Sequence, residues 1–192
     1  MRHLSDQQTR LLQKHILDIR GTIDEETADY VRNALTELAA AGTPPIKILI
    51  TSSGGDVDIG LHIYDGVACY RNTVEGIVIG FARSMAAIIL QGCDVRMCLP
   101  HSKILIHHVS QRQVKLDDMR DETKRMDILA KTEVNQNYLY KILAERTGKT
   151  IEVIRCECEK DRNMTAEEAL EFGLIDEIVP TRKFIRREVE KK

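Results

Sequence analysis

Short apolar runs alternate with longer stretches of mixed apolar and polar residues along most of the chain. The runs are rich in Ile, Val and Leu, and the central ones are almost continuously apolar, as in strands that are buried on both faces. They predict strands at Lys14–Arg20, Ile46–Thr51, Val74–Ile79, Val95–Leu99, Lys103–His107 and Ile175–Val179.

The stretches between these strands repeat apolar residues at helical spacing. Two capping-box patterns, Thr22-x-x-Glu25 and Thr165-x-x-Glu168, indicate helix starts. The predicted helices run from Thr22 to about Ala41, over Ile59–Tyr70, Met85–Leu90 and Leu116–Arg146, and from Thr165 to Gly173. This alternation predicts an α/β fold with a mainly parallel sheet and flanking helices, and the length suits a single domain over residues 1–192.

Ser84 occupies the junction between a predicted strand and a predicted helix. Backbone N–H groups at a helix start lack intrahelical partners and carry the positive end of the helix dipole. A hydroxyl at this point can attack a carbonyl carbon while the N–H of Met85 stabilises the oxyanion that forms. Serine is also a common helix cap, so this stretch alone leaves capping as an alternative role for Ser84.

A glycine pair, Gly54-Gly55, follows an earlier predicted strand and supplies a second turn. Such a pair is most often only a tight turn, and no Walker-type Lys-Ser or Lys-Thr follows it, which argues against nucleotide binding. Parallel strands, however, deliver their C-terminal turns to one edge of the sheet, where ligands of α/β folds bind. The two turns together can therefore hold the anion that forms at an attacked carbonyl.

A serine nucleophile needs a base, and His107 or His108, at the end of a predicted strand, could supply it. Strand alternation should send the two imidazoles to opposite faces, so that only one of them can serve. The acid that orients the imidazole could be Glu157, Glu159 or Asp161, and spacing does not decide among these three.

The overall composition does not point to nucleic acid or to a membrane. A net charge of -2, with 4% aromatic residues and no Trp, offers neither a basic nor a stacking surface to nucleic acid. The longest apolar run, Met85–Leu90, is too short to span a bilayer, and the first residues are too polar for a signal peptide. We therefore expect a cytoplasmic protein with no nucleic-acid or membrane partner.

The five cysteines are scattered and odd in number, which fits no disulfide framework and favours the cytosol. Cys156 and Cys158 could be combined with His107 and His108 as zinc ligands, but their spacing fits no standard zinc site. Ordinary packed thiols are the favoured interpretation, and we expect no metal and no cofactor.

Four ordered parts of the chain resemble the proteolytic subunit of the Clp protease (ClpP) family, whose members are serine peptidases with a crotonase-like fold. These parts are TSSGGDVDIGLHIYDGV, GFARSMAAIILQG, LPHSKILIHH, and the closing pair ILAERTGKTIEVI and KDRNMTAEEALEFGLIDEIV. The resemblance extends from about Leu11 to Val179. The distance from Gly55 to Ser84 matches the family without a gap.

The resemblance implies a set of site residues at the matching positions. It implies Ser84 as the nucleophile, His107 as the base and Asp161 as the orienting acid. The N–H groups of Gly55 and Met85 would form the oxyanion hole. It also implies a ClpP/crotonase-like α/β fold with a long protruding handle helix, in a segment at about residues 109–146.

The resemblance further implies the partners of the protein. These are unfolded polypeptides as substrates, copies of the chain in a heptameric homo-oligomeric ring, and a separate Clp-type ATPase unfoldase. The sequence departs from the family pattern in having Ser53 in place of a proline and His108 in place of a glutamine. The segment VSQRQVKLDDMRDE also replaces the glycine-rich strand that follows the base in the family.

Two other functions fit parts of the sequence. A non-catalytic ClpP-like ring subunit would normally have lost a triad member, whereas all three positions are filled here. A crotonase-type acyl-CoA enzyme would need neither a serine at position 84 nor a histidine at position 107, and its usual adenine-binding features are not apparent.

Overall fold

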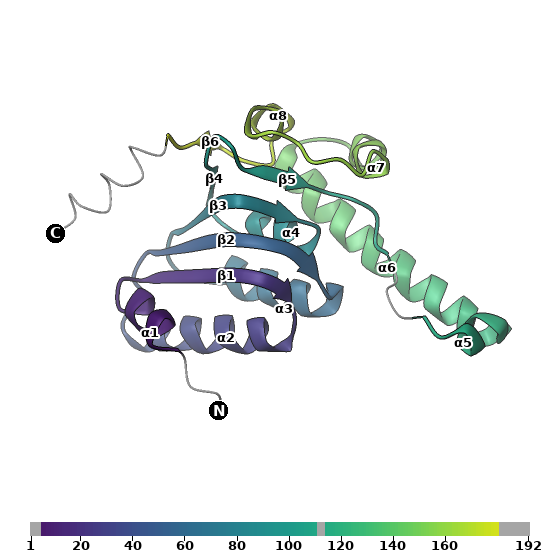
Figure 1. The fold of residues 1–192 in the computed structure, drawn as a ribbon, viewed down its shortest axis with the longest axis horizontal. Helices are drawn as coiled ribbons and strands as arrows, with labels where there is room; N and C mark the ends of the chain where they lie inside the picture. The colour runs from purple at the N-terminus through teal and green to yellow at the C-terminus, as the bar shows by residue number, and fades with distance from the viewer. Residues whose placement is uncertain (1–4, 111–113, 181–192) are drawn as a thin grey trace.

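The structure is a computed structural model that describes residues 5–110 and 114–180. Within these residues all the strands pair in parallel and form one sheet, in the order β1-β2-β3-β4-β6, with β5 also paired to β3 (Figure 1). The strands are β1 (Ile16–Ile23), β2 (Ile46–Gly55), β3 (Val74–Arg83), β4 (Val95–Cys98), β5 (Lys103–Leu105) and β6 (Glu177–Ile178). The predicted α/β fold with a parallel sheet and flanking helices is confirmed.

The helices are placed between and after these strands. They are α1 (Asp6–Leu12), α2 (Glu25–Ala40), α3 (Val57–Ala68), α4 (Met85–Gln91), α5 (Leu116–Arg120), α6 (Glu122–Thr147), α7 (Ile151–Glu159) and α8 (Ala166–Phe172). Figure 1 shows α2, α3 and α4 lying along the sheet, and every residue of α4 is buried. The helix that follows Ser84 is therefore the centre of the apolar core, which fixes the position of its first turn.

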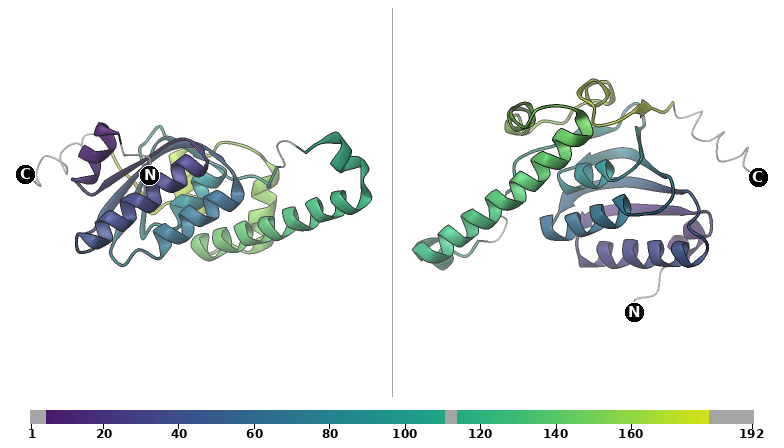
Figure 2. Two further views of the ribbon diagram at one scale, coloured as in Figure 1. Left: turned by 90° about the horizontal axis from the view of Figure 1, so that it is seen from below. Right: turned by 180° about the vertical axis from the view of Figure 1, so that it is seen from behind.

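The long predicted helix is present and leaves the body of the molecule. In Figures 1 and 2, α6 runs outward from the sheet edge and α5 lies at its far end. The half of α6 near the body buries Leu139, Tyr140 and Leu143. Large apolar side chains toward the far end remain exposed, namely Leu116, Met119, Met126 and Leu129. The handle is thus anchored at one end and presents apolar surface at the other.

The segment predicted as one helix over Leu116–Arg146 is in fact two helices. The chain leaves helical geometry at Asp121, whose backbone is extended (φ −79°, ψ 117°). Its Oδ1 then accepts a hydrogen bond from the N–H of Lys124 and so caps α6 (3.1 Å). An aspartate at this position favours a new helix start over an uninterrupted helix.

Several predicted boundaries were also wrong. Thr22 does not cap a helix, because it belongs to β1, and Asp24 caps α2 instead. The predicted turns after β2 and β3 are strand as far as Gly55 and Arg83, since both strands keep pairing with their neighbours. The helices α1 and α7 were not predicted at all.

Candidate active site

The double-glycine turn at the end of β2 is held by a buried serine. The hydroxyl of Ser52 donates to the carbonyl oxygen of Gly21 (2.7 Å) and accepts from the N–H of Gly54 (3.1 Å). Gly54 has φ +86°, a left-handed conformation that glycine adopts without the strain of a side chain. The Ser52 hydrogen bond therefore fixes the turn to β1, and Gly54 allows the backbone conformation that the turn requires.

Ser84 lies in a strained turn between β3 and α4. Its φ of +54° and ψ of −127° are rare for a residue with a side chain. Its N–H donates to the carbonyl oxygen of Leu105 (2.9 Å), and its own carbonyl accepts from the N–H of Ala87 (2.9 Å). Strain at one residue of a strand–helix turn is typical of serine nucleophiles that are presented to substrate.

The Ser84 hydroxyl does not cap α4. It makes no side-chain cap hydrogen bond, although Ser84 occupies the N-cap position. Capping was the alternative role that the sequence left open, and the geometry of the turn removes it. Ser84 as a whole is half-buried.

The two turns are packed directly against each other. A methyl group on Gly54 would place its carbon 2.6 Å from Cβ of Ser84 and 3.0 Å from the backbone nitrogen of Met85. Only a residue without a side chain allows this approach. The side chain of Met85 is itself buried against Gly60 of α3. This packing fixes the backbone nitrogen of Met85 beside the glycine turn, where the sequence predicted one oxyanion-hole donor.

Both histidines follow the end of β5, which is shorter than predicted. The strand stops at Leu105, so His107 and His108 are not governed by strand alternation. Both line the same cavity, and the premise of the predicted alternation is removed because neither residue is in a strand. They differ in their contacts, because Nδ1 of His108 is hydrogen bonded to the hydroxyl of Tyr140 on α6 (2.7 Å).

The cavity has a volume of about 650 Å3 and joins the two turns, the histidine segment and α6. Gly55, Ser84 and His107 all line it. Its buried apolar lining comes from the end of β1, from α4, from the segment after β5, and from α6, namely Ile23, Ile88, Ile106, Leu139 and Leu143. Polar lining comes from the starts of α2 and α3 and from α6, and includes Asp24, Asp56, Asp58, Lys131 and Asn135. The space therefore combines reactive polar groups with an apolar wall.

The sequence did not predict that α6 would wall this cavity. One feature of the sequence could have indicated it. Leu139, Tyr140 and Leu143 lie at neighbouring helical positions in the last part of the helix, and all three are buried against the body of the molecule. On α3, Asp58 forms an ion pair with Nζ of Lys131 (3.1 Å) and accepts a hydrogen bond from Nδ2 of Asn135 (3.1 Å). These two contacts join α6 to the start of α3.

Asp161, the predicted orienting acid, lies outside the cavity lining. It is exposed, with φ +45°, just after α7, and its side chain makes no hydrogen bond or ion pair within the described residues. The segment that carries Asp161 is nevertheless bridged to β5, the strand before His107. Met164 and Ile104 form an antiparallel bridge with two backbone hydrogen bonds (2.7 and 3.1 Å). Asp161 lies three residues before Met164, and His107 lies three residues after Ile104.

The neighbourhood of Asp161 is also tied to the Ser84 turn. Oδ1 of Asn163 accepts a hydrogen bond from Nε of Arg83, the residue before Ser84 (2.8 Å). Glu157, an alternative acid, is buried and paired with Lys160 and with Arg162 (3.4 Å to its Oε1). Glu159, the other alternative, is exposed on α7.

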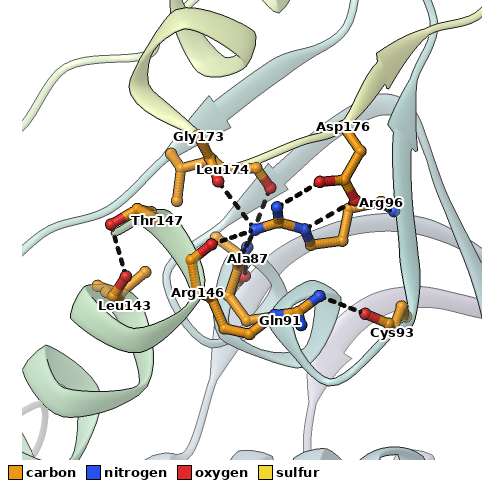
Figure 3. Close-up of polar contacts among 10 residues, drawn as sticks. All are labelled: Ala87, Gln91, Cys93, Arg96, Leu143, Arg146, Thr147, Gly173, Leu174 and Asp176. Carbon is orange, nitrogen blue, oxygen red and sulfur yellow. Dashed lines mark hydrogen bonds and ion pairs between the residues drawn. The ribbon is translucent and has the colours of Figure 1, made fainter. Parts of the chain in front are cut away.

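A buried arginine on β4, Arg96, joins the ends of α4, α6 and α8 (Figure 3). Arg96 donates to the carbonyl oxygens of Gly173 (2.8 Å) and Arg146 (3.2 Å) and to Oε1 of Gln91 at the end of α4 (2.7 Å). It also forms a two-pronged ion pair with Asp176. A guanidinium at the carbonyl ends of α6 and α8 is favourable for the helix dipoles. Sequence patterns did not predict this network, because most of its members are far apart along the chain.

Three further properties concern the described residues, 5–110 and 114–180. No group of three or more His, Cys, Asp or Glu side chains is arranged there to hold a metal ion. None of the helices in that part of the chain is long and apolar enough to cross a membrane. Burial raises the pKa of the Cys158 thiol to about 12.

The architecture is that of the ClpP/crotonase-like α/β class: a parallel sheet with flanking helices, a long projecting helix, and a serine and a histidine at one cavity. A family model of the Clp protease matches residues 1–182, and the chain therefore belongs to the Clp protease family. This membership confirms the family resemblance seen in the sequence. It also assigns the chain, in general terms, to the ClpP-type peptidases, which are hydrolases.

Proposed function

We propose that this chain is a serine endopeptidase subunit that cleaves unfolded polypeptides into short peptides through an acyl-enzyme. The observation that carries the proposal is the shared cavity, which Gly55, Ser84 and His107 line together. The Ser84 hydroxyl is not used to cap α4, and its turn is strained. These features suit a nucleophile better than a structural serine.

In the proposed mechanism, His107 accepts the proton of the Ser84 hydroxyl as Oγ attacks a peptide carbonyl carbon. The N–H groups of Gly55 and Met85 donate to the oxyanion of the tetrahedral intermediate. His107 then gives its proton to the leaving amine, and water hydrolyses the acyl-enzyme by the reverse sequence. Asp161 holds the imidazole in the tautomer that this sequence requires. No cofactor or metal takes part.

The proposed substrate is an extended peptide segment that adds main-chain hydrogen bonds beside the sheet edge. The buried apolar lining from Ile88, Ile106 and Leu143 would receive one of its side chains. A site of this kind is open to any unfolded chain. For this reason we propose a homo-oligomeric ring, heptameric by resemblance to the family, that encloses the site in the cytoplasm, together with a separate Clp-type ATPase that delivers unfolded substrate.

An active-site serine probe tests the proposal. The full-length protein is treated with a fluorophosphonate and its intact mass is measured, with Ser84→Ala as the control. We expect one adduct on the native chain and none on Ser84→Ala, together with loss of fluorogenic-peptide hydrolysis in the variant by at least about 10³-fold. Labelling of Ser84→Ala to the same extent as the native chain would refute Ser84 as the nucleophile.

One observation favours a second candidate, a non-catalytic ring subunit. Asp161 is exposed and its carboxylate has no partner among the described residues. A subunit that only completes an assembly would tolerate this arrangement. Such a subunit would form oligomers of normal size but would not hydrolyse peptides alone. In the experiment above, the native chain would then show neither a fluorophosphonate adduct nor hydrolysis of the fluorogenic peptide.

A further inference from the structure

The segment that carries His107 is tied to the handle helix by two hydrogen bonds. Oε1 of Gln136 accepts from the N–H of Val109, with 2.5 Å between the two atoms. The hydroxyl of Tyr140 is bonded to Nδ1 of His108 at 2.7 Å. Gln136 and Tyr140 are four residues apart on α6, so they face the same side of the helix one turn apart.

A further anchor holds the same segment from the other side. The carbonyl oxygen of Leu105 accepts the N–H of Ser84 (2.9 Å). His107 thus lies midway between two bonded residues. Leu105, two residues before it, is bonded to the Ser84 turn, and Val109, two residues after it, is bonded to α6. Residues 106–110 lie outside the strands, so sheet pairing does not fix this part of the backbone.

We propose that Gln136 and Tyr140 are positioning residues for His107, and that the handle helix thereby sets the distance between the imidazole and the Ser84 hydroxyl. This inference rests on the proposed function, in which His107 is the general base. Proton transfer requires the two groups to be within hydrogen-bond reach, and small displacements of a reacting group are costly to the rate.

The contacts of Gln136 favour a positioning role over a purely stabilising one. Its Nε2 is buried and has no hydrogen-bond partner within the described residues. A buried donor without a partner opposes the gain from the single bond to Val109. Replacing Gln136 by Met, which has a similar length, removes the unpaired Nε2 donor but takes the acceptor from the N–H of half-buried Val109, so one unpaired donor is exchanged for another. The substitution should therefore alter the placement of the segment more than the stability of the fold.

The hydrogen bond of Tyr140 can also be removed without changing the packing of its ring. Its buried ring meets the imidazole of His108 edge-on, with the ring centroids 6.1 Å apart. Tyr140→Phe keeps this ring contact and removes only the hydroxyl. At the other end of the bond, a glutamine at position 108 still offers an acceptor to Tyr140, whereas an alanine does not.

The test compares Tyr140→Phe and Gln136→Met with matched controls on the same helix, Tyr138→Phe and Asn137→Met, whose side chains are exposed. Each full-length variant is assayed with a short fluorogenic peptide, and its thermal midpoint is recorded. We expect kcat to fall about tenfold in each test variant, with KM within about twofold and the midpoint close to native. The controls and His108→Gln should retain native kcat, and His108→Ala should behave like Tyr140→Phe.

A second measurement does not depend on peptidase activity. Diethyl pyrocarbonate modifies imidazoles, and the modified positions are located by fragmentation of the tryptic peptides. We expect the modification rate of His107, relative to that of exposed His101, to rise about twofold or more in Tyr140→Phe and Gln136→Met because the segment opens more often. The controls should match the native protein.

The two measurements separate the possible failures. If kcat and the His107 modification rate are both native in the test variants, or if the controls change equally, the positioning role is refuted. If the native chain hydrolyses no peptide, the proposed function fails, while the modification rates still decide whether Gln136 and Tyr140 hold His107 in place.

Discussion

Gly54 and Ser84 touch so closely that no side chain fits between them. A methyl carbon on Gly54 would lie 2.6 Å from Cβ of Ser84 and 2.7 Å from the carbonyl oxygen of Arg83. Gly54 lies at the end of β2, and Ser84 directly follows β3. Their contact is therefore the point at which the two halves of the candidate site are joined.

The first prediction is that Gly54→Ala disrupts the site more than its size suggests. The added methyl must push the Ser84 turn away, and the left-handed φ at Gly54 adds backbone strain. We expect peptide hydrolysis to fall by about 10²-fold or more. The matched control is Gly42→Ala, because Gly42 also has a left-handed φ but has open space where the methyl would be placed. Equal activity in the two variants would contradict the proposed packing role.

The second prediction distinguishes the neighbouring histidines. His107→Ala should lose nearly all hydrolysis, because the nucleophile loses its base. His108→Gln should be close to native, since it restores the residue usual in the family and keeps a partner for Tyr140. Steady-state rates with one fluorogenic peptide decide the matter. The reverse result, with His108 essential and His107 dispensable, would exchange their roles.

The third prediction concerns Asp161. If its carboxylate turns toward His107 during the reaction, Asp161→Asn should lower kcat by about 10²- to 10⁴-fold, because the imidazole is held in the wrong tautomer. Glu159→Gln, an exposed acid on the preceding helix, serves as the control and should be near native. Near-native turnover in Asp161→Asn would remove this residue from the triad.

The fourth prediction follows from the ion pair between Arg96 and Asp176. Partial burial favours the neutral carboxyl, but the hydrogen bonds and charge of Arg96 outweigh it and hold the pKa of Asp176 below its usual value. A carboxyl with a lowered pKa in the folded state stabilises the protein above the unfolded pKa, and that stability is lost as the pH falls through the folded pKa. The ion pair should therefore contribute at neutral pH and fade below about pH 4.

Urea unfolding measures this contribution. The Asp176 side chain is 41% exposed, so solvent screens the pair, and we expect Asp176→Asn to lower the free energy of unfolding at pH 7 by about 1–2 kcal/mol. The difference from the native protein should shrink at pH 3. Asp117→Asn, at a far more exposed aspartate, should change little at either pH. A difference that stays constant with pH would show that charge is not the cause.

The fifth prediction concerns assembly. The far end of the handle exposes Leu116, Met119, Met126 and Leu129, a concentration of apolar surface that favours contact with another copy. We expect light scattering to show a species larger than a monomer, and Met126→Asp to reduce its mass. Glu133→Asp, on the same helix at an exposed position, is the control. A native protein that is monomeric at all concentrations would contradict the predicted ring.

The sequence predicted those features that depend on neighbours along the chain. Alternating apolar runs and helical periodicity gave the α/β class and the order of most elements, because each element must bury one face whatever lies around it. The strand–turn–helix pattern around Ser84 likewise placed a serine at a helix start. The Thr165-x-x-Glu168 capping box was confirmed because all of its hydrogen bonds are local.

Tertiary structure alone decided the features that depend on segments far apart in the sequence. The Arg96 network joins residues from β4 to the ends of two later helices, and no local pattern records such contacts. The end of β5 at Leu105 was set by the length of its partner β3, not by the apolar run that continues past it. His107 and His108 both follow this strand end, so strand alternation does not govern them, and both line one cavity.

Burial along the long handle segment also depends on tertiary structure. Helical spacing identified it as helix, but the spacing is similar where side chains are buried, as at Leu139, and where they are exposed, as at Met126. Only packing against the body decides which half is covered. The sequence thus determined the elements and the chemical groups at their ends, whereas the tertiary structure determined which of these groups meet, because contact depends on sheet register and on how the helices pack.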